Sequence, residues 1–421
     1  MQTIRKGVIA VAVAAASLQM AHASQQSEAK GFAEGSKLNV LNRNMFMQRD
    51  WKNGDSNSAG KSYVEEWGHS FITTFNSGFT QGTVGFGLDA YAGVALKLDS
   101  SQGRSGAGML EVKDNGDPKD EFSIAGAAVK AQFSSTVIKY GNQLPNLPIF
   151  AISDSRLLPE TVIGTLVTSN EIKDLTLNAG RFTALRNRNQ SMQDSMRLTK
   201  TDFFGGTYKF TEKLSGSAYW AETEDYFRKY YGNINYVAPL SDTQSLIFDV
   251  NMYDTKSDGE GRFRAWDEDE LDNRLYSFAV GYKFGAHTLT LSHQRVSGDG
   301  GYVYDIDGGS TMFTPHSVLI SDFNREDEKS WGVRYDLNMA GYGVPGLTFM
   351  GRYIRGTDFT NDNTDDGEEW ERDIEAKYVL QNGPAKDLSM RLRYGTRRSS
   401  DIDNGNLEDL RVIVEYPLSI L

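Results

Sequence analysis

The sequence predicts an all-β fold, a transmembrane antiparallel β-barrel of about 18 strands. In residues 387–398, Met390 and Leu392 lie on one parity, and Arg391 and Arg393 lie on the other. Successive side chains of a strand face opposite ways, so one face of this segment is apolar and the other is cationic. The same alternation recurs along nearly the whole chain, which has too few apolar residues for so large a buried core. A sheet with its apolar face toward lipid and its polar face toward a lumen accounts for both observations.

The N-terminal segment has the three parts of a secretory signal peptide. Two basic residues precede an apolar run over residues 8–18, and Ala21-His22-Ala23 forms a cleavage site. We therefore expect residues 1–23 to be a signal peptide and residues 24–421 to form one outer-membrane β-barrel domain. No later segment has the roughly 18 consecutive apolar residues of a spanning helix, which excludes a helical inner-membrane protein.

Each expected strand is an alternating segment bounded by turn residues such as Gly, Pro, Asn and Asp. One example is the segment that places Tyr276, Phe278 and Val280 on the parity expected to face lipid. The expected strands lie near residues 37–49, 63–76, 81–98, 121–133, 135–142, 160–169, 174–182, 201–210, 214–224, 229–238, 244–254, 271–284, 286–297, 329–339, 346–357, 369–381, 387–398 and 407–417.

The connections between these strands alternate in length. Short ones, such as residues 211–213 and 382–385, alternate with long polar ones. In bacterial barrels the short turns are periplasmic and the long loops are extracellular, so we expect both termini in the periplasm. Residues 142–159 contain three prolines and cannot form a central strand.

Composition limits the possible partners. The formal net charge of −12 makes nucleic acid an unsuitable partner, and the absence of cysteine excludes disulfides and thiolate metal sites. The acid-rich stretches 362–371 and 401–409 do not have the spacing of a calcium-binding EF-hand loop. We expect them to be solvated extracellular loops, and we expect no metal site and no cofactor.

Basic residues recur on the parity that faces the lumen. The first and last strands are neighbours in a closed barrel, so these residues map to one side of the lumen, where guanidinium groups would attract and guide carboxylates. The alternative is that they pair with acids of the wall, such as Asp373 and Glu375. This set, called the basic ladder below, is Arg43, Arg49, Arg334, Arg352, Lys377, Arg391, Arg393 and Arg411.

Several motifs are spread along the chain. They are Gly31 to Lys37 leading to Arg43 and Arg49-Asp50, Asp154 to Thr161, Ala179 to Thr183, Ser321-Asp322-Phe323 followed by Ser330-Trp331-Gly332, and Glu415 to Leu418. In these motifs the chain resembles the OprD family of outer-membrane carboxylate channels, over essentially the whole mature sequence. The resemblance implies an eighteen-stranded barrel, narrowed by infolded loops to an eyelet in which a basic ladder faces acidic and hydroxyl groups.

Two loops, residues 141–159 and 297–328, are the constricting loops that the resemblance implies. An arginine that faces acidic and hydroxyl groups across a narrow gap could orient a solute that has a carboxylate at one end. The alternative is that both are ordinary surface loops. The expected constriction residues are Asp154, Ser155, Arg156, Tyr302, Tyr304, Asp305, Asp307 and Ser310.

The function expected from the resemblance is passive, selective uptake of small carboxylates across the outer membrane. The arginine-rich wall favours aromatic or cyclic carboxylates, and the family also includes channels for basic amino acids or small peptides. An enzyme such as a barrel phospholipase or protease would need a nucleophile and a base in hydrogen-bond reach, and the four mature histidines lie in no recognisable serine-nucleophile motif. Outer-membrane lipid and lipopolysaccharide are the expected surroundings of a monomer or loose trimer.

Overall fold

The computed structural model describes residues 24–193, 198–260, 271–304 and 312–421. The expected signal peptide, residues 1–23, lies outside the described residues and stays a prediction. Within the described residues no helix is long and apolar enough to cross a membrane.

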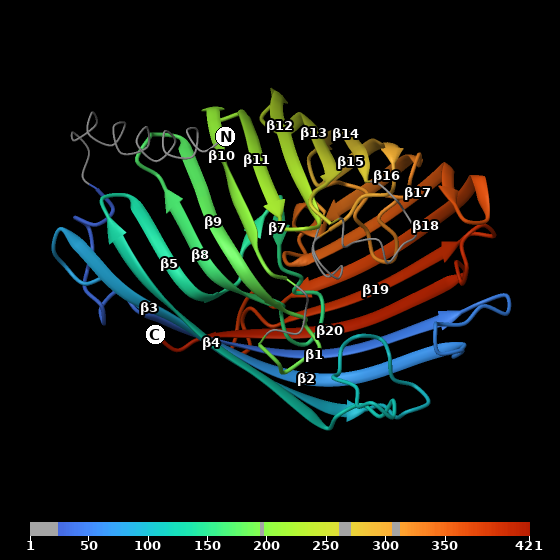
Figure 1. Ribbon diagram of the computed structural model, residues 1–421, viewed down its shortest axis with the longest axis horizontal. Coiled ribbons are helices and arrows are strands. Elements are labelled where there is room, and N and C mark those ends of the chain that lie inside the picture. The colour runs from blue at the N-terminus through green and yellow to red at the C-terminus, as the bar shows by residue number, and fades with distance from the viewer. Residues whose placement is uncertain (1–23, 194–197, 261–270, 305–311) are drawn as a thin grey trace.

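Eighteen antiparallel strands form one closed barrel, because β1 pairs with β2 on one side and with β20 on the other. Figure 1 shows these strands curving around a common interior. They are β1 (Lys37–Trp51), β2 (Tyr63–Asn76), β3 (Val84–Asp99), β4 (Glu121–Phe133), β5 (Thr136–Gln143), β8 (Thr161–Ser169), β9 (Leu175–Arg186), β10 (Thr201–Thr211), β11 (Leu214–Thr223), β12 (Phe227–Ser241), β13 (Gln244–Ser257), β14 (Asp272–Phe284), β15 (His287–Asp299), β16 (Lys329–Asn338), β17 (Leu347–Asn361), β18 (Thr364–Val379), β19 (Ser389–Arg398) and β20 (Leu407–Ser419).

The predicted strand number and fold class are confirmed, and most strand ends agree within a few residues. The clearest error is at β18, which begins at Thr364 rather than near residue 369. A tight turn after Asn361 joins β17 to β18, so the expected acidic loop at 362–371 is wrong. Five of those acidic residues instead lie in strand β18, where Glu369 and Glu371 are buried and Asp365, Asp366 and Glu368 are exposed. A short 3₁₀ helix, η2 (Met339–Tyr342), lies in the β16–β17 turn.

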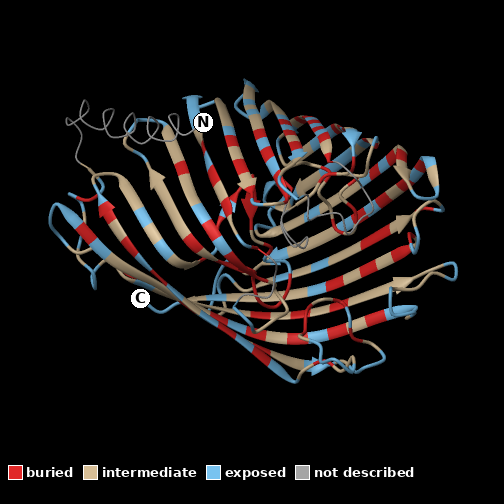
Figure 2. Cartoon of the chain, viewed as in Figure 1, coloured by how far each residue is buried: buried red, intermediate tan, exposed pale blue. Residues whose placement is uncertain are grey.

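The outer face carries the apolar parity. Tyr276 and Phe278 of β14 are exposed, whereas Leu275 and Ser277 on the opposite parity are buried. Figure 2 shows the same alternation of exposed and buried residues along many strands. Val280 belongs to the same outer set, since it shares the parity of Tyr276. A soluble sheet would bury this parity, so the exposure pattern indicates a lipid-facing surface.

We expect Val280→Arg to destabilise the barrel by about 2 to 4 kcal/mol, because the arginine would place a charge in the lipid-facing band. Thr290→Arg is the matched control, since Thr290 lies on the adjacent strand β15 but on the opposite parity to the exposed Leu289 and Leu291. Urea unfolding in lipid vesicles measures the destabilisation caused by each variant. Equal destabilisation by the two variants would contradict the assigned faces.

Two loops fill much of the interior. The loop between β5 and β8 contains a small hairpin, β6 (Asn146–Leu147) and β7 (Phe150–Ala151), which Figure 1 shows inside the ring of strands. Leu147 and Phe150 pack in one apolar cluster with wall residues such as Phe182. An eighteen-stranded barrel is too wide for wall side chains alone to fill it, so infolded loops supply the missing core.

Glycines of the inner wall make room for the same loop. A Cβ at Gly68 would lie 2.3 Å from the Leu157 side chain, and one at Gly93 would lie 2.9 Å from Leu158. The hydroxyl of Ser70 also donates a 2.7 Å hydrogen bond to the Leu157 carbonyl. The loop therefore lies directly against the wall of β2 and β3.

Candidate functional site

The basic ladder occupies six consecutive strands of the closed barrel. These are β16, β17, β18, β19, β20 and β1, each hydrogen-bonded to the next. The sequence places Arg391 and Arg393 on the parity opposite the exposed Met390 and Leu392, so both arginines face the lumen. The ladder thus lies on one side of the pore.

The register brings acidic residues into the ladder. Arg352 lies opposite Asp373 across the β17–β18 pair, and Arg49 lies opposite Asp409 across the β1–β20 pair. Arg393 is opposite Glu375 on one side and Arg411 on the other. Acidic and basic residues therefore share cross-strand rows of the same wall.

Most ladder residues form ion pairs. The alternative that wall acids pair with the arginines therefore describes the geometry, and it does not exclude a solute path. The nitrogen–oxygen distances are 2.8 Å for Arg43–Glu415, 2.9 Å for Arg49–Asp409, 2.7 Å for Arg334–Asp336, 2.6 Å for Arg352–Asp373, 2.8 Å for Arg393–Glu375 and 2.7 Å for Arg411–Asp409.

Arg391 and Lys377 are the least compensated members. Arg391 lies 3.7 Å from Glu375, which already pairs with Arg393. Lys377 faces Arg391 directly across β18 and β19, and it has no ion pair to another described residue. Two like charges that face each other repel, so this part of the wall favours an anion between them.

Arg43 attaches the first loop to the wall. Its guanidinium donates to both oxygens of Asp154, at 2.8 and 3.1 Å, and to the carbonyl oxygen of Arg156 at 2.6 Å. The same group pairs with Glu415. Asp154 keeps 47% of its side chain exposed, and Ser155 is also exposed. These two expected constriction residues therefore reach open space, whereas Arg156 is buried.

Positive charge concentrates beside this loop. Arg156 donates to the Ala107 carbonyl at 3.2 Å and to Ser155, and its guanidinium pairs with no described carboxylate. Burial, followed by repulsion from Arg411 and Arg188, lowers the pKa of Arg156 well below its ordinary range. A guanidinium remains charged in proteins, so the repulsive part of this shift reflects the charges of Arg411 and Arg188 nearby. Arg188, which the sequence analysis missed, donates to Ser153 and Ser155 at 3.0 and 3.3 Å.

The second loop is also held against the wall. Lys229 of β12 donates to the carbonyl oxygens of Val303 and Tyr304 and lies over the Tyr302 ring, 4.5 Å from its centroid. Tyr302 is buried, and the Tyr304 hydroxyl donates to Asp322. Both tyrosines therefore contact loop and wall groups. The expected residues Asp305, Asp307 and Ser310 lie outside the described residues and stay predictions.

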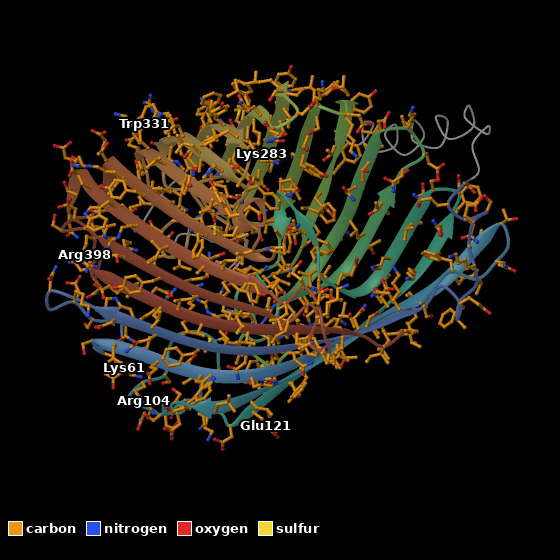
Figure 3. The ribbon with its side chains drawn as sticks, turned by 180° about the vertical axis from the view of Figure 1, so that it is seen from behind. Lys61, Arg104, Glu121, Lys283, Trp331 and Arg398 are labelled. Atoms are coloured by element: carbon orange, nitrogen blue, oxygen red, sulfur yellow. The ribbon has the colours of Figure 1, made fainter. Side chains whose placement is uncertain are left out.

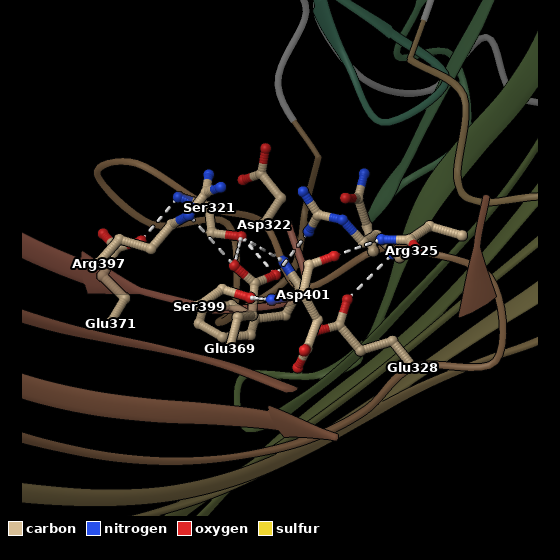
Figure 4. A network of polar contacts seen from close by, with 12 residues as sticks. Ser321, Asp322, Arg325, Glu328, Glu369, Glu371, Arg397, Ser399 and Asp401 are labelled. Atoms are coloured by element: carbon tan, nitrogen blue, oxygen red, sulfur yellow. Dashed lines mark hydrogen bonds and ion pairs between the residues drawn. The ribbon is translucent and has the colours of Figure 1, made fainter. Parts of the chain in front are cut away.

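Acidic residues of β18 also contact this loop through hydrogen bonds and an ion pair (Figure 4). Glu371 accepts hydrogen bonds from the backbone nitrogens of Ile320 and Ser321 at 2.9 and 2.7 Å. Glu369 accepts from the Ser321 hydroxyl and pairs with Arg325 at 2.6 Å. Both side chains are buried, so the sequence signal that could have identified them was their inward parity rather than their position in an acid-rich stretch.

His316 makes another loop-to-wall contact. Its Nε2 lies 2.8 Å from the Ser292 hydroxyl of β15, and its Nδ1 lies 2.7 Å from the Ser330 hydroxyl of β16. Burial, followed by repulsion from His293 and Arg352, lowers the pKa of His316 to about 3. The imidazole is therefore neutral at physiological pH.

We expect the contact of His316 with Ser292 and Ser330 to weaken as the pH falls. Because the pKa of His316 is lowered from 6.5 to about 3, the folded arrangement holds this imidazole in its neutral form. The stability of the arrangement is complete above pH 6.5 and is lost progressively as the pH falls from 6.5 toward 3. The loss should be about 1 to 3 kcal/mol between pH 7 and pH 4.5, seen as more frequent conductance fluctuations. His316→Gln should remove this pH dependence, and His287→Gln, at a partly exposed histidine of β15, should retain it. Identical pH responses in both variants would contradict the role of His316.

Known proteins share this architecture. A model of a family described as outer membrane porin, OprD family, matches residues 30–420. The chain is 44% identical over 454 residues to Porin D of Pseudomonas aeruginosa, with 100% of both chains covered. The crystal structure of Pseudomonas aeruginosa OccK9 (OpdG) is similar with a TM-score of 0.87 and 32% identity, covering 93% of this chain and 100% of that chain. The crystal structure of Pseudomonas aeruginosa OpdK with vanillate gives a TM-score of 0.84 and 32% identity, covering 92% and 100%.

Proposed function

Because the chain belongs to the OprD family of outer membrane porins, we propose that it takes up small aromatic or cyclic carboxylates, such as benzoate, along the basic ladder. It is a channel of the Gram-negative outer membrane and not an enzyme. The proposal concerns the solute and its path. Vanillate, present in the crystal structure of OpdK, is an aromatic carboxylate, which supports this class of solute.

The surplus of positive charge on the ladder carries the proposal. Seven of its eight basic groups pair with six carboxylates, those of Asp154, Asp336, Asp373, Glu375, Asp409 and Glu415, and Lys377 pairs with no described carboxylate, so the ladder has two more positive than negative charges. In a narrow lumen with low-dielectric walls, such a surplus attracts anions. Pairing with acids also limits how tightly a carboxylate is held, and transport requires release.

The same pairing supports a second candidate, a channel for basic amino acids or small peptides. Acidic and basic groups share the same wall, and Asp154 presents a half-exposed carboxylate beside Arg43. A solute that carries both charges could contact both kinds of group. The acids of the wall therefore support a solute with a positively charged group, while the positive surplus favours a carboxylate.

The test is single-channel conductance and vesicle uptake with benzoate, cyclohexanecarboxylate, arginine and a neutral sugar of similar size. The proposal expects the two carboxylates to pass faster than both arginine and the neutral sugar. Faster passage of arginine than of benzoate would favour the second candidate. Equal passage of all four solutes would contradict both.

The apolar outer face also suggests the surroundings of the barrel. Exposed side chains such as Phe278 and Leu291 would contact outer-membrane lipid, and the rim with the long loops would meet lipopolysaccharide. We expect a monomer or a loose trimer, which native mass spectrometry in detergent can distinguish.

A further inference from the structure

We propose that the extracellular end of the lumen holds a capture site for aromatic carboxylates, built around Arg49, Trp51 and Lys61. The inference rests on the proposed function and adds a binding step before the narrow part of the pore. A cavity of about 510 Å³ lies where three long loops meet, and these residues line it together with serine and asparagine side chains. Its volume is within the range of small-molecule sites, about 300 to 1,000 Å³.

Strand β1 places a cation and an aromatic ring side by side. Arg49 and Trp51 are two residues apart on one strand, so their side chains share the lumenal face about 7 Å apart. Trp51 packs against the apolar cluster of the inner wall, which holds its indole in place. A benzoate-sized solute can therefore lie against the indole with its carboxylate toward Arg49.

The positive charges at this cavity are only partly compensated. Asp409 is the only described carboxylate paired with Arg49, and it pairs with Arg411 as well, so one acid serves two guanidiniums. The Lys61 ammonium is held by neutral oxygens, the carbonyls of Gln102 and Ser105, at 2.6 and 3.0 Å. Lys61 and the labelled Arg104 lie near each other along the same rim of the barrel in Figure 3.

The three loops are tied together, so the cavity is preformed. The backbone nitrogen of Ser56 donates to the Asn404 side chain at 2.9 Å, and that of Asn406 donates to Asp55 at 2.9 Å. Lys61 joins the first loop to the loop between β3 and β4. A preformed cavity costs little ordering entropy when a solute binds.

Hydroxylated rings suit the remaining lining. Ser56 and Ser58 line the cavity, and their hydroxyls make no hydrogen bond to another described residue. They can pair with ring hydroxyls of a solute whose carboxylate lies near Arg49 and Lys61. The expected ligand class is therefore an aromatic monocarboxylate, bound better when it carries ring hydroxyls.

The test uses the full mature chain in planar bilayers, with 3,4-dihydroxybenzoate, benzoate or acetate added to one side at a time. Trp51→Leu and Lys61→Gln should each lower the association rate of 3,4-dihydroxybenzoate from the extracellular side by about threefold to tenfold. The rate from the periplasmic side should not change. Lys61→Arg should restore the charge and the rate, and Trp331→Leu, on the lipid-facing parity, should have no effect.

Adding the carboxylate to the extracellular and the periplasmic side in turn distinguishes this inference from the proposed function. If wild-type protein shows carboxylate-dependent blockades and Trp51→Leu leaves both association rates unchanged, the capture site is wrong and the channel function stands. Equal slowing from both sides would also overturn it. Wild-type protein without any carboxylate-dependent blockade would contradict the proposed function itself.

Discussion

Replacing Arg391 and Arg393 together by glutamine should lower benzoate permeability by about tenfold and leave that of a neutral sugar of similar size unchanged. The two arginines share Glu375, at 3.7 and 2.8 Å. The wild-type group therefore carries one net positive charge, and the double variant carries one net negative charge. Because the local charge changes sign, the variant should repel benzoate rather than only fail to attract it.

Glu375 provides matched controls for this experiment. Glu375→Gln alone leaves two positive charges, and the triple variant with all three residues as glutamine leaves none. Benzoate permeability should therefore fall in the order Glu375→Gln, wild type, triple variant, double variant. Vesicle uptake of benzoate measures this order, and neutral-sugar uptake reports any change in pore width.

The salt dependence of benzoate permeability shows whether Arg391 and Arg393 guide the solute or only pair with Glu375. At physiological ionic strength the Debye length is roughly 8 Å, comparable to the dimensions of a narrowed pore, and it shortens as salt is added. The differences between variants should therefore shrink at high salt. If the double variant passes benzoate at the wild-type rate at every ionic strength, Arg391 and Arg393 act only as structural partners of Glu375.

The fold could be predicted closely because each strand repeats the same two-residue period. The side chains of β14 show this, since a shift of one residue would turn Tyr276 and Phe278 from lipid into the lumen. The start of β18 was missed for a physical reason. Asp365 and Asp366 resemble loop residues in composition, and only the pairing of Asn361 with Thr364 shows that a tight turn precedes them.

The candidate site was only partly predictable. Parity placed the ladder arginines on the inner face, but it could not show which acids contact them. Arg188 and His316 lie in loops without periodicity, so the sequence gives no signal of where they point. Their positions depend on long-range contacts, such as that of His316 with Ser292 and Ser330.

We expect simultaneous replacement of Glu369 and Glu371 by alanine to widen the pore and to reduce its selectivity. Glu371 accepts hydrogen bonds from the backbone nitrogens of Ile320 and Ser321, and removing it leaves one partly buried and one buried donor without partners, at up to about 1 to 3 kcal/mol each. Removing Glu369 also leaves Arg325 without its carboxylate. A cost of about 3 kcal/mol shifts a two-state equilibrium by roughly 150-fold, which is enough to populate a released loop.

The control lies on the same strand. Glu368 is next to Glu369, but its side chain is on the outer parity and pairs with Arg355 where both are 54% exposed. Glu368→Ala should therefore leave conductance unchanged, because an exposed pair contributes little to stability. Heat-modifiable migration on gels confirms that each variant still forms a folded barrel.

Remaining contacts determine how far the loop can move. On the N-terminal side of the lost clamp, Arg411 still donates to the Leu319 carbonyl at 3.0 Å, and His316 still binds Ser292 and Ser330. On its C-terminal side, Gln294 donates to the Asp322 and Phe323 carbonyls at 3.0 and 2.8 Å, so the loop stays tethered on both sides. The expected result is therefore a noisier pore of higher conductance with weaker discrimination between benzoate and a neutral sugar. Adding His316→Gln to the double variant should increase both effects, since it removes a second tether. A folded variant with wild-type conductance and selectivity would show that residues 312–328 do not narrow the solute path.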